Sequence, residues 1–304
     1  MPSQFLQSRE WQKLQESLGR KTDLSENGLI LFLPLRFKKQ YAYMPRGPIA
    51  GLGQLPERLN TLIKRTGKQS SIFFRVEPPL EDNTMHREIL RSLGFKEVQS
   101  IQPEETFFIN LNRSEVELLA GMEHNTRYAI RTAERRSVTI SIAERSREKR
   151  DRFDEFWELF RETNKRHRLD SYGKRYYEAV AALEGDCRSK LFIAYLDGKP
   201  ISVALFVYYR ETATYLFAAS AKGYGKYNAP SLVLWKAVQD AKKDRCAVLD
   251  LWGASSSKKG WAGLSAFKKS FGGTAFRFVG TWDYVFDKTW YCFYKAAKQL
   301  AALV

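Results

Sequence analysis

The fold is decided by residues 190–252, which read KLFIAYLDGKPISVALFVYYRETATYLFAASAKGYGKYNAPSLVLWKAVQDAKKDRCAVLDLW. Two apolar runs, Lys190–Leu196 and Ile201–Tyr209, flank the dipeptide Asp197-Gly198, and this arrangement predicts a β-hairpin with a tight turn. The pattern then predicts a strand, a helix and a further strand, at Thr212–Ala221, Ser231–Lys243 and Val248–Trp252. Strands that alternate with helices in this way indicate an α/β fold.

The first hundred residues show the same alternation. Apolar runs predict strands at Leu29–Leu35 and Ser71–Val76, and helical periodicity predicts helices at Ser8–Gly19 and Leu55–Thr66. A new strand begins near Glu105, and both halves then contain a strand, a helix and a strand in similar order. A chain of 304 residues is long enough for two domains, so we expect a break near Glu105 and a duplicated fold.

The charge balance predicts a polyanionic partner. The chain has 50 Lys and Arg against 34 Asp and Glu, a formal net charge of +16, which suits nucleic acid, a phosphorylated substrate or an anionic membrane surface. Its apolar runs are too short to span a bilayer. The first residues do not show a charged start followed by an apolar stretch, so we do not expect a secretory signal. Its three cysteines lack paired spacing and its three histidines are scattered. We therefore expect a cytoplasmic protein without a metal site or a disulfide framework.

A basic helix is the clearest electrostatic feature. In the helix predicted at Asn125–Arg136, Arg127, Arg131 and Arg135 recur at every fourth position and share one face. Such a face could follow the phosphate backbone of a nucleic acid, because that contact needs several cations on one surface and no base-specific contacts. A helix face that is simply solvated is an equally good interpretation of the same charges.

The loop Ala219–Pro230 lies between a predicted strand and a predicted helix. It resembles the place where acetyltransferases of the GNAT class bind the pyrophosphate of coenzyme A with backbone amides. Gly223 and Gly225 are present, but Pro230 heads the helix and supplies no N–H group. The sequence therefore predicts the fold of that class without the cofactor.

Taken together, the motifs resemble the Fem family, the tRNA-dependent transferases that add amino acids to peptidoglycan precursors. The matching stretches follow the family's order along nearly the whole chain: SREWQKL, YMPRGP, RVEP, TRYAIRTAERRSVTI, KLFIAYLDGKPIS, ATYLFAAS, APSLVLWKAVQDAK, LDLWG and FKKSFGG. The resemblance implies two tandem GNAT-like domains, with mixed sheets flanked by helices. One would comprise residues 1–104 plus 280–304 and the other residues 105–279.

The same resemblance implies a reaction centre. Lys268 in FKKSFGG, the most specific motif, corresponds to the lysine at the family's reaction centre, and Phe267 lies beside it. Glu77 in RVEP stands where the family often has an acidic residue that could remove a proton, and it equally fits a strand-end carboxylate paired with Arg75. By residue type alone, Lys268 would be an exposed surface lysine.

The resemblance further implies residues that bind the precursor. Lys13 in WQKL corresponds to a lysine that binds its diphosphate, and Tyr176 corresponds to a substrate-contacting tyrosine. Tyr172 replaces an arginine that touches the precursor in relatives, a role that Arg168 could take over, and Phe217 replaces a tyrosine. The expected substrate-binding set is Lys13, Arg46, Arg75, Arg168, Tyr172, Tyr176 and Phe217.

The implied function is transfer of an amino acid from aminoacyl-tRNA to an amine of a peptidoglycan precursor, UDP-MurNAc-pentapeptide or lipid II. The partners would be the tRNA and the precursor, with peripheral contact to the inner membrane surface and with no cofactor or metal. Two other classes fit the same sequence. One is a GNAT-type acyl-CoA-dependent N-acyltransferase, and the other is a non-catalytic RNA-binding module.

Overall fold

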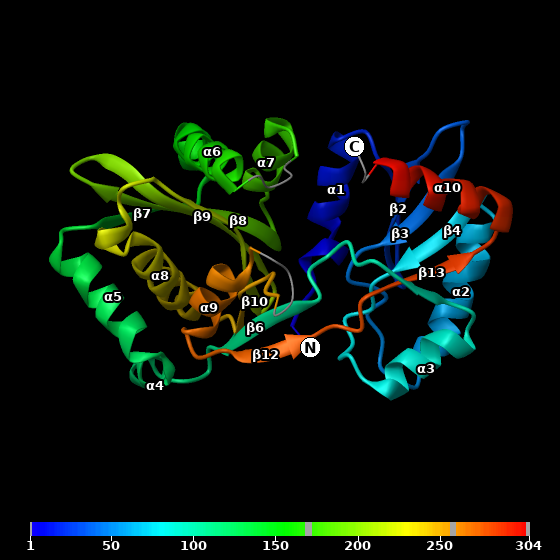
Figure 1. Cartoon of the computed structure of the whole chain (residues 1–304), viewed down its shortest axis with the longest axis horizontal. Coiled ribbons are helices and arrows are strands. Elements are labelled where there is room, and N and C mark those ends of the chain that lie inside the picture. The colour runs from blue at the N-terminus through cyan, green and yellow to red at the C-terminus, as the bar shows by residue number, and fades with distance from the viewer. Residues whose placement is uncertain (1, 168–171, 256–259, 302–304) are drawn as a thin grey trace. The chain divides into compact units, whose positions relative to one another are not determined.

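A computed structural model describes residues 2–167, 172–255 and 260–301. The chain forms two compact units (Figure 1). One unit comprises residues 1–5 and 105–276, and we call it the central unit because most of it is the middle of the sequence. The other comprises residues 6–104 and 277–304, and we call it the flanking unit because its segments lie on either side in the sequence.

The unit boundaries differ from the sequence expectation at two short segments, residues 1–5 and 277–279. The first residues belong to the central unit, where the Ser3 N–H donates to Thr212 Oγ1 at 2.8 Å. Residues 277–279 belong to the flanking unit, where the Phe278 N–H donates to the Glu104 carbonyl at 2.7 Å. The bonding partners of both segments are distant in sequence, so local patterns could not assign them.

The flanking unit is built on a six-stranded sheet with the order β1-β2-β3-β4-β13-β5, in which β3 and β4 are parallel and the other neighbours antiparallel. Its elements are η1 (Phe5–Gln7), α1 (Arg9–Ser17), β1 (Lys21–Ser25), β2 (Gly28–Pro34), β3 (Gln40–Met44), α2 (Leu55–Gly67), β4 (Ser71–Val76), α3 (Thr84–Ser92), β5 (Lys96–Val98), β13 (Thr281–Val285) and α10 (Lys288–Ala301). Side chains alternate along β4, so Phe74 packs in the core with α2 and α3 whereas Phe73 packs against α10. In Figure 1, α10 lies on the other face of this sheet from α2 and α3.

The central unit is built on a seven-stranded sheet with the order β12-β6-β11-β10-β9-β8-β7, in which β10 and β11 are parallel. Its elements are β6 (Glu105–Asn110), α4 (Glu115–Gly121), α5 (His124–Arg135), β7 (Thr139–Ala143), α6 (Ser146–His167), α7 (Lys174–Ala181), β8 (Cys187–Leu196), β9 (Lys199–Tyr209), β10 (Thr212–Ser220), η2 (Gly225–Tyr227), α8 (Ala229–Lys243), β11 (Val248–Asp250), α9 (Ala262–Lys269) and β12 (Thr274–Arg277). In Figure 1, α6 and α7 cover one face of the sheet, and α5 and α8 cover the other.

The predicted hairpin is present as β8 and β9. Asp197 and Gly198 both have positive φ angles, 49° and 75°, as a type I′ turn requires. Each unit thus combines a mixed sheet with helices on both faces, and the expected α/β class is confirmed.

Candidate functional site

Lys268, on α9 of the central unit, is buried rather than exposed. Its side chain is 5% accessible, and its Nζ donates to the carbonyls of Trp252 and Gly253, the latter at 2.7 Å. The same ammonium lies 5.6 Å from the centre of the Tyr215 ring. The residue that FKKSFGG singled out is therefore an internal lysine that holds the segment after β11.

The turn after β11 explains how two carbonyls reach one ammonium. Trp252 and Gly253 have consecutive positive φ angles of 42° and 64°, which turn the backbone out of the strand. Asp250 supports this turn, because its Oδ1 accepts the Trp252 N–H at 2.8 Å and the Thr106 hydroxyl at 2.5 Å. The strained backbone is thus held from both ends, by a carboxylate and by Lys268.

The environment of Lys268 favours the neutral amine. Burial lowers the pKa of Lys268 to about 7, although the charge of Asp250 acts in the opposite direction. Within the part of the chain that the structure describes, no carboxylate lies within ion-pair distance of its Nζ. A lysine with a pKa near neutrality can carry or release a proton during a reaction at physiological pH.

A β-bulge in β10 separates Tyr215, which contacts Lys268, from Phe217, which was predicted to bind the precursor. The pairing register of β10 with β9 shifts between Tyr215 and Phe217, so these two residues lie on opposite faces of the sheet. Tyr215 stacks on Phe206 on the face covered by α8, whereas Phe217 packs against Phe160 of α6 on the other face. The parallel pairing of β10 with β11 stops just before this bulge, at Thr214.

Tyr172, Tyr176 and Phe217 belong to one aromatic cluster on the α6 and α7 face. Tyr172 is 56% exposed, and its ring centroid lies 4.3 Å from that of Tyr176. Tyr176 contacts the buried Tyr177, which in turn packs on Phe217 at 5.0 Å. The cluster therefore runs from the core to the surface and offers one exposed ring. Arg168, also assigned to this site, lies outside the described residues.

Two further predicted site residues are Phe267 of the central unit and Lys13 of the flanking unit. Phe267 is half-buried and packs edge-on against Phe271 at 5.3 Å beside the main core of the central unit. Lys13 is exposed on α1 of the flanking unit, where its side chain is available to a ligand.

The contacts of Glu77 favour a structural role. Its Oε1 accepts from the Thr281 hydroxyl at 2.6 Å and from the backbone N–H groups of Ile101 and Gln102. Its Oε2 accepts from the Tyr43 hydroxyl at 2.5 Å, and burial and the Glu77 charge raise the pKa of Tyr43 well above its ordinary value. Four donors match the roughly four lone-pair sites of a carboxylate, so Glu77 holds the flanking unit together.

Arg75 and Arg46 are also built into the flanking unit. Arg75 forms a bidentate ion pair with Asp283, with both N···O distances at 2.7 Å, and both side chains are almost fully buried. The alternative pairing of Arg75 with Glu77 was wrong, because residues 75 and 283 lie opposite each other in the β4–β13 ladder. Arg46 is buried, stacks 3.6 Å above the Phe278 ring and donates to the Pro103 carbonyl.

The three arginines of α5 are not equivalent. Arg127 is half-buried, and its guanidinium donates to the Met122 carbonyl just beyond the end of α4. Arg131 and Arg135 are exposed and line a surface hollow of about 400 Å³ together with Tyr128 and Glu134. The basic face therefore divides into one arginine that fixes the α4–α5 connection and two that face solvent.

A second basic hollow adjoins the end of α5, and the sequence did not single it out. Arg136, Lys226 and Tyr227 are among its lining residues, and its volume is about 420 Å³. Arg136 donates to the Lys226 carbonyl and lies 5.9 Å from the Tyr227 ring. The tyrosines in AKGYGKYNAP, interleaved with lysines, were the signal that could have revealed it.

The loop before α8 has the geometry of a closed turn. The N–H groups of Tyr227 and Asn228 bond to the carbonyls of Tyr224 and Gly225 within the turn, and Pro230 has no N–H to offer. These amides are therefore engaged rather than pointing toward a pyrophosphate. Among the described residues, no cluster of acidic, histidine and cysteine side chains could hold a metal ion, and no helix is long and apolar enough to cross a membrane.

The chain was compared with family profiles, curated sequences and solved structures, and two of these comparisons cover most of its length. A sequence profile of the FemAB family matches residues 91–199 and 195–299. Among solved structures, one described as the crystal structure of FemX superposes with a TM-score of 0.81 and 18% identity, covering 96% of this chain and 94% of that one. A search of curated protein sequences gave no match.

Two further solved structures share the fold at lower similarity. L-PGS from Bacillus licheniformis gives a TM-score of 0.58 and 13% identity, covering 92% of each chain. A tandem GNAT protein from the clavulanic acid biosynthesis pathway gives a TM-score of 0.50 and 10% identity, covering 84% of this chain and 78% of that one. Tandem GNAT-like domains are therefore the architecture that these proteins have in common.

Proposed function

Because the chain belongs to the FemAB family, as the order of its motifs predicted, we propose that it is an aminoacyltransferase that uses aminoacyl-tRNA. Its acceptor is an amine of a peptidoglycan precursor, UDP-MurNAc-pentapeptide or lipid II. Lys268 carries the proposal, since a fully buried lysine with a pKa near 7 lies within the most specific motif of the family resemblance.

The reaction needs little covalent chemistry from the protein. The acceptor amine attacks the ester carbonyl of the aminoacyl-tRNA, a new C–N bond forms, and the ester C–O bond breaks as the tRNA hydroxyl leaves. The ester is already activated, so the protein has to align two substrates and stabilise the oxyanion. No nucleophilic side chain is required, because no covalent enzyme intermediate forms.

Lys268 suits the stabilisation of the oxyanion. In its protonated form it is a cation in a site shielded from water, where such a charge stabilises a developing negative charge more strongly than in solvent. The phosphates of a bound tRNA would raise its pKa and favour that form. The carbonyls of Trp252 and Gly253 orient the ammonium before the substrates arrive.

The remaining surfaces suit two polyanionic substrates. On the central unit, Arg131 and Arg135 face solvent beside Tyr128, and Arg136 and Lys226 lie near Tyr227. Cations interleaved with aromatic rings can bind a sugar-phosphate backbone and stack on unpaired bases. We assign this surface to the tRNA.

On the flanking unit, the exposed Lys13 is assigned to the diphosphate of the precursor. On the central unit, the aromatic cluster around Tyr172 and Tyr176 is a separate candidate surface for its sugars or peptide. An exposed ammonium can form charge-assisted hydrogen bonds with a diphosphate, and exposed rings can pack on the apolar faces of sugars and peptides. The closed turn before α8 argues against coenzyme A as the acyl donor, because the amides of Tyr227 and Asn228 are already bonded and Pro230 has none.

Incubation with a pool of charged tRNA and each precursor, followed by mass spectrometry of the precursor, tests the function. We expect a mass increase of one amino acid residue that disappears when the tRNA is deacylated beforehand. Lys268→Met should abolish the product, whereas Lys269→Met, which changes the exposed neighbour in the same motif, should keep it. Product formed from acetyl-CoA instead, or tRNA binding without transfer to any precursor, would contradict the proposal.

A further inference from the structure

The hairpin between β2 and β3 presents an aromatic residue to solvent. The Leu35 N–H donates to the Lys39 carbonyl at 2.7 Å, which closes the loop, and Phe37 and Lys38 have positive φ angles of 59° and 55°. Residues with side chains rarely adopt this conformation, so the loop is held in an uncommon shape. Phe37 lies at the tip of this loop and is 77% exposed.

The Phe37 ring continues into α10, although the two segments are far apart in sequence. Its ring centroid lies 5.8 Å from that of Trp290, which in turn lies 5.8 Å from that of Phe293. Phe293 is 63% exposed, whereas Trp290 is half-buried. We call Phe37, Trp290 and Phe293 the aromatic ridge of the flanking unit.

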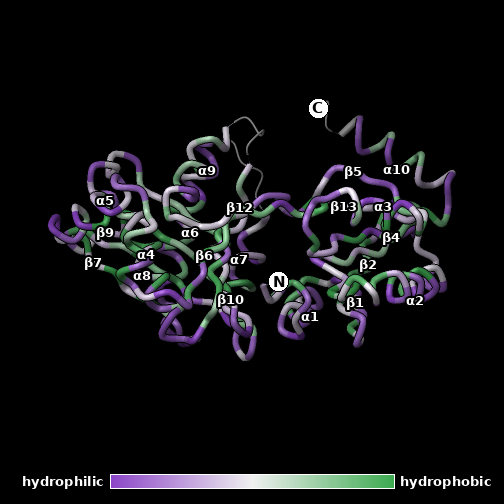
Figure 2. Tube along the Cα trace, turned by 90° about the horizontal axis from the view of Figure 1, so that it is seen from below, coloured by the Kyte–Doolittle hydropathy of each residue, from purple (hydrophilic) through white to green (hydrophobic). Residues whose placement is uncertain are grey.

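Packing within the flanking unit accounts for only part of this ridge. Trp290 packs against the buried cluster that contains Phe73 and Tyr291, whereas Phe37 and Phe293 remain exposed. The sheet is contacted mainly by Tyr291 and Tyr294, which pack against Phe73 at 5.3 and 4.9 Å. Figure 2 shows hydrophobic and hydrophilic residues alternating along α10. Beyond the buried side, the exposed Phe293 is followed one turn later by the exposed Ala296 and Ala297. The helix therefore has an apolar stripe that faces solvent.

Basic residues occupy the two segments that carry the aromatic ridge. The loop of Phe37 holds the exposed Arg36 and Lys38 and the half-buried Lys39, and α10 holds the exposed Lys288, Lys295 and Lys298. The Lys39 ammonium lies 5.0 Å above the Trp290 ring. The adjoining carboxylate, Asp287, accepts the Trp290 N–H at 3.0 Å, and neither residues 35–41 nor residues 288–301 contain an acidic side chain.

We propose that the aromatic ridge docks the flanking unit on an anionic phospholipid membrane. Aromatic rings are favoured at the boundary between headgroups and acyl chains, and flanking lysines and arginines are attracted to anionic headgroups. A convex loop tip with an exposed phenylalanine suits insertion between lipids better than stacking of nucleic acid bases. The charge around the ridge is complementary to such a surface.

This docking goes beyond the proposed function, since none of the residues assigned to transfer belongs to the ridge. It would hold the enzyme at the membrane whichever precursor accepts the amino acid. Loss of vesicle binding and loss of transfer can therefore be measured separately.

The full chain is mixed with sedimenting vesicles of phosphatidylcholine alone or of equal parts phosphatidylglycerol and phosphatidylcholine. We expect binding to the anionic vesicles that falls with added salt, and little binding to the neutral ones. Phe37→Ser combined with Phe293→Ser should weaken binding at least about tenfold, and Lys38→Gln about fivefold. Transfer to the soluble precursor should not change.

Val116→Ser is the matched control, because Val116 on α4 is also 77% exposed but lies between Glu115 and Glu117. It should bind anionic vesicles like the unchanged chain. Equal binding by the double phenylalanine variant, an equal loss in the Val116 variant, or a loss of tRNA binding in place of vesicle binding would overturn the proposal.

The cysteines offer a second readout. Cys292 is exposed next to Phe293, whereas Cys187 and Cys246 are buried. A polarity-sensitive fluorophore attached to Cys292 should shift to shorter wavelength on anionic vesicles. An unchanged spectrum in the presence of bound vesicles would show that α10 stays in water and would overturn insertion of the ridge.

Discussion

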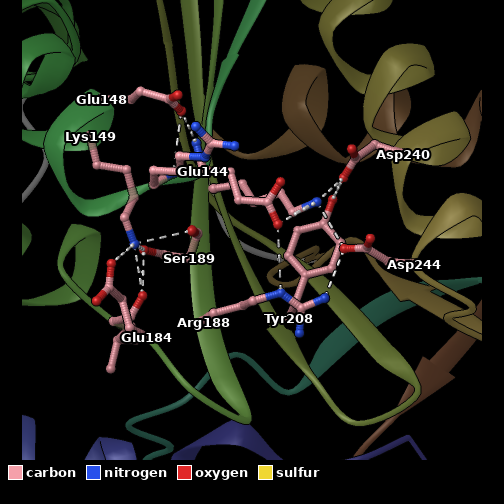
Figure 3. A network of polar contacts seen from close by, with 12 residues as sticks. Glu144, Glu148, Lys149, Glu184, Arg188, Ser189, Tyr208, Asp240 and Asp244 are labelled. Atoms are coloured by element: carbon pink, nitrogen blue, oxygen red, sulfur yellow. Dashed lines mark hydrogen bonds and ion pairs between the residues drawn. The ribbon is translucent and has the colours of Figure 1, made fainter.

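Lys190 and Lys268 are both buried in the central unit, at 1% and 5% exposure, yet their surroundings are opposite. The Lys190 ammonium lies 2.9 Å from Asp240 and 2.8 Å from Asp244. Figure 3 shows these two carboxylates beside Tyr208, whose hydroxyl donates to Asp240 at 2.7 Å. Burial opposes the charge of Lys190, but the hydrogen bonds and charges of Asp244 and Asp240 raise its pKa above its ordinary value.

Lys268 instead faces two carbonyls and an aromatic ring, and burial lowers its pKa to about 7. A buried lysine among carboxylates keeps its proton and serves the fold, whereas a buried lysine among neutral dipoles can serve a reaction. Burial alone therefore does not identify a catalytic lysine. The groups that contact its ammonium distinguish a catalytic lysine from a structural one.

The largest expected effect on stability concerns Lys190. Lys190→Met should lower the free energy of unfolding by about 3 kcal/mol, because it removes the buried cation that the half-buried Asp240 and Asp244 share and leaves only Arg188 beside Asp244. Denaturant unfolding measures this. Adding Asp240→Asn should recover part of the loss, and an unchanged midpoint would mean that the ion pairs do not hold the sheet and helix together.

Lys268→Met should have the opposite effect to Lys190→Met, since it should reduce transfer and leave stability largely unchanged. We expect transfer to fall by at least about 10²–10³-fold, the range for losing a donor to an oxyanion, while stability at pH 7 is retained. The folded pKa of Lys268 lies below its ordinary value, so the unfolded chain binds more protons between about pH 7 and pH 10. Stability of the unchanged chain should therefore rise over that range, and the rise should be smaller in the variant. Near-normal turnover would remove Lys268 from the mechanism.

Lys13 extends the comparison to an exposed lysine. Lys13→Ala should weaken binding of the precursor by about 1.5–3 kcal/mol, the range for a charge-assisted hydrogen bond, and should leave stability unchanged. Calorimetry with UDP-MurNAc-pentapeptide measures this affinity. An equal affinity in the variant would identify an ordinary solvated lysine.

The arginines of α5 also divide into residues for binding and a residue for stability, with smaller expected effects. Arg131→Gln with Arg135→Gln should flatten the dependence of log tRNA affinity on log salt by up to about two units, one for each phosphate contact. Glutamine retains the helix propensity, so the helix should persist. Arg127→Gln should chiefly lower stability, since Arg127 binds the end of α4. A salt slope that matches the unchanged chain would exclude this face as the tRNA site.

Local sequence patterns predicted the fold well where elements are strongly periodic. The hairpin β8–β9, the helices α5 and α8 and the break at Glu105 follow from hydrophobic alternation and turn residues. The short strands β1, β12 and β13 and the helix α9 were not predicted. The strands depend on pairing with partners far away in sequence, such as β13 between β4 and β5. A C-terminal helix within residues 280–304 was expected from the family resemblance and is present as α10.

The candidate site was less predictable for the same reason. The motif identified Lys268, but residue type suggested an exposed lysine, because the carbonyls that enclose it come from a turn sixteen positions earlier. Glu77 looked reactive in sequence, yet its four donors come from three separate segments. The bulge that separates Tyr215 from Phe217 likewise has no signature in the run TYLFAAS.

The most direct test of the contrast is an NMR titration of lysines labelled with ¹³C at Cε. The resonance that is missing in Lys268→Met should titrate at about pH 7, and the one missing in Lys190→Met should stay protonated above the ordinary lysine range. A Lys268 resonance that titrates near pH 10 would contradict the account, because it would mean that the lysine is solvated or paired with a carboxylate.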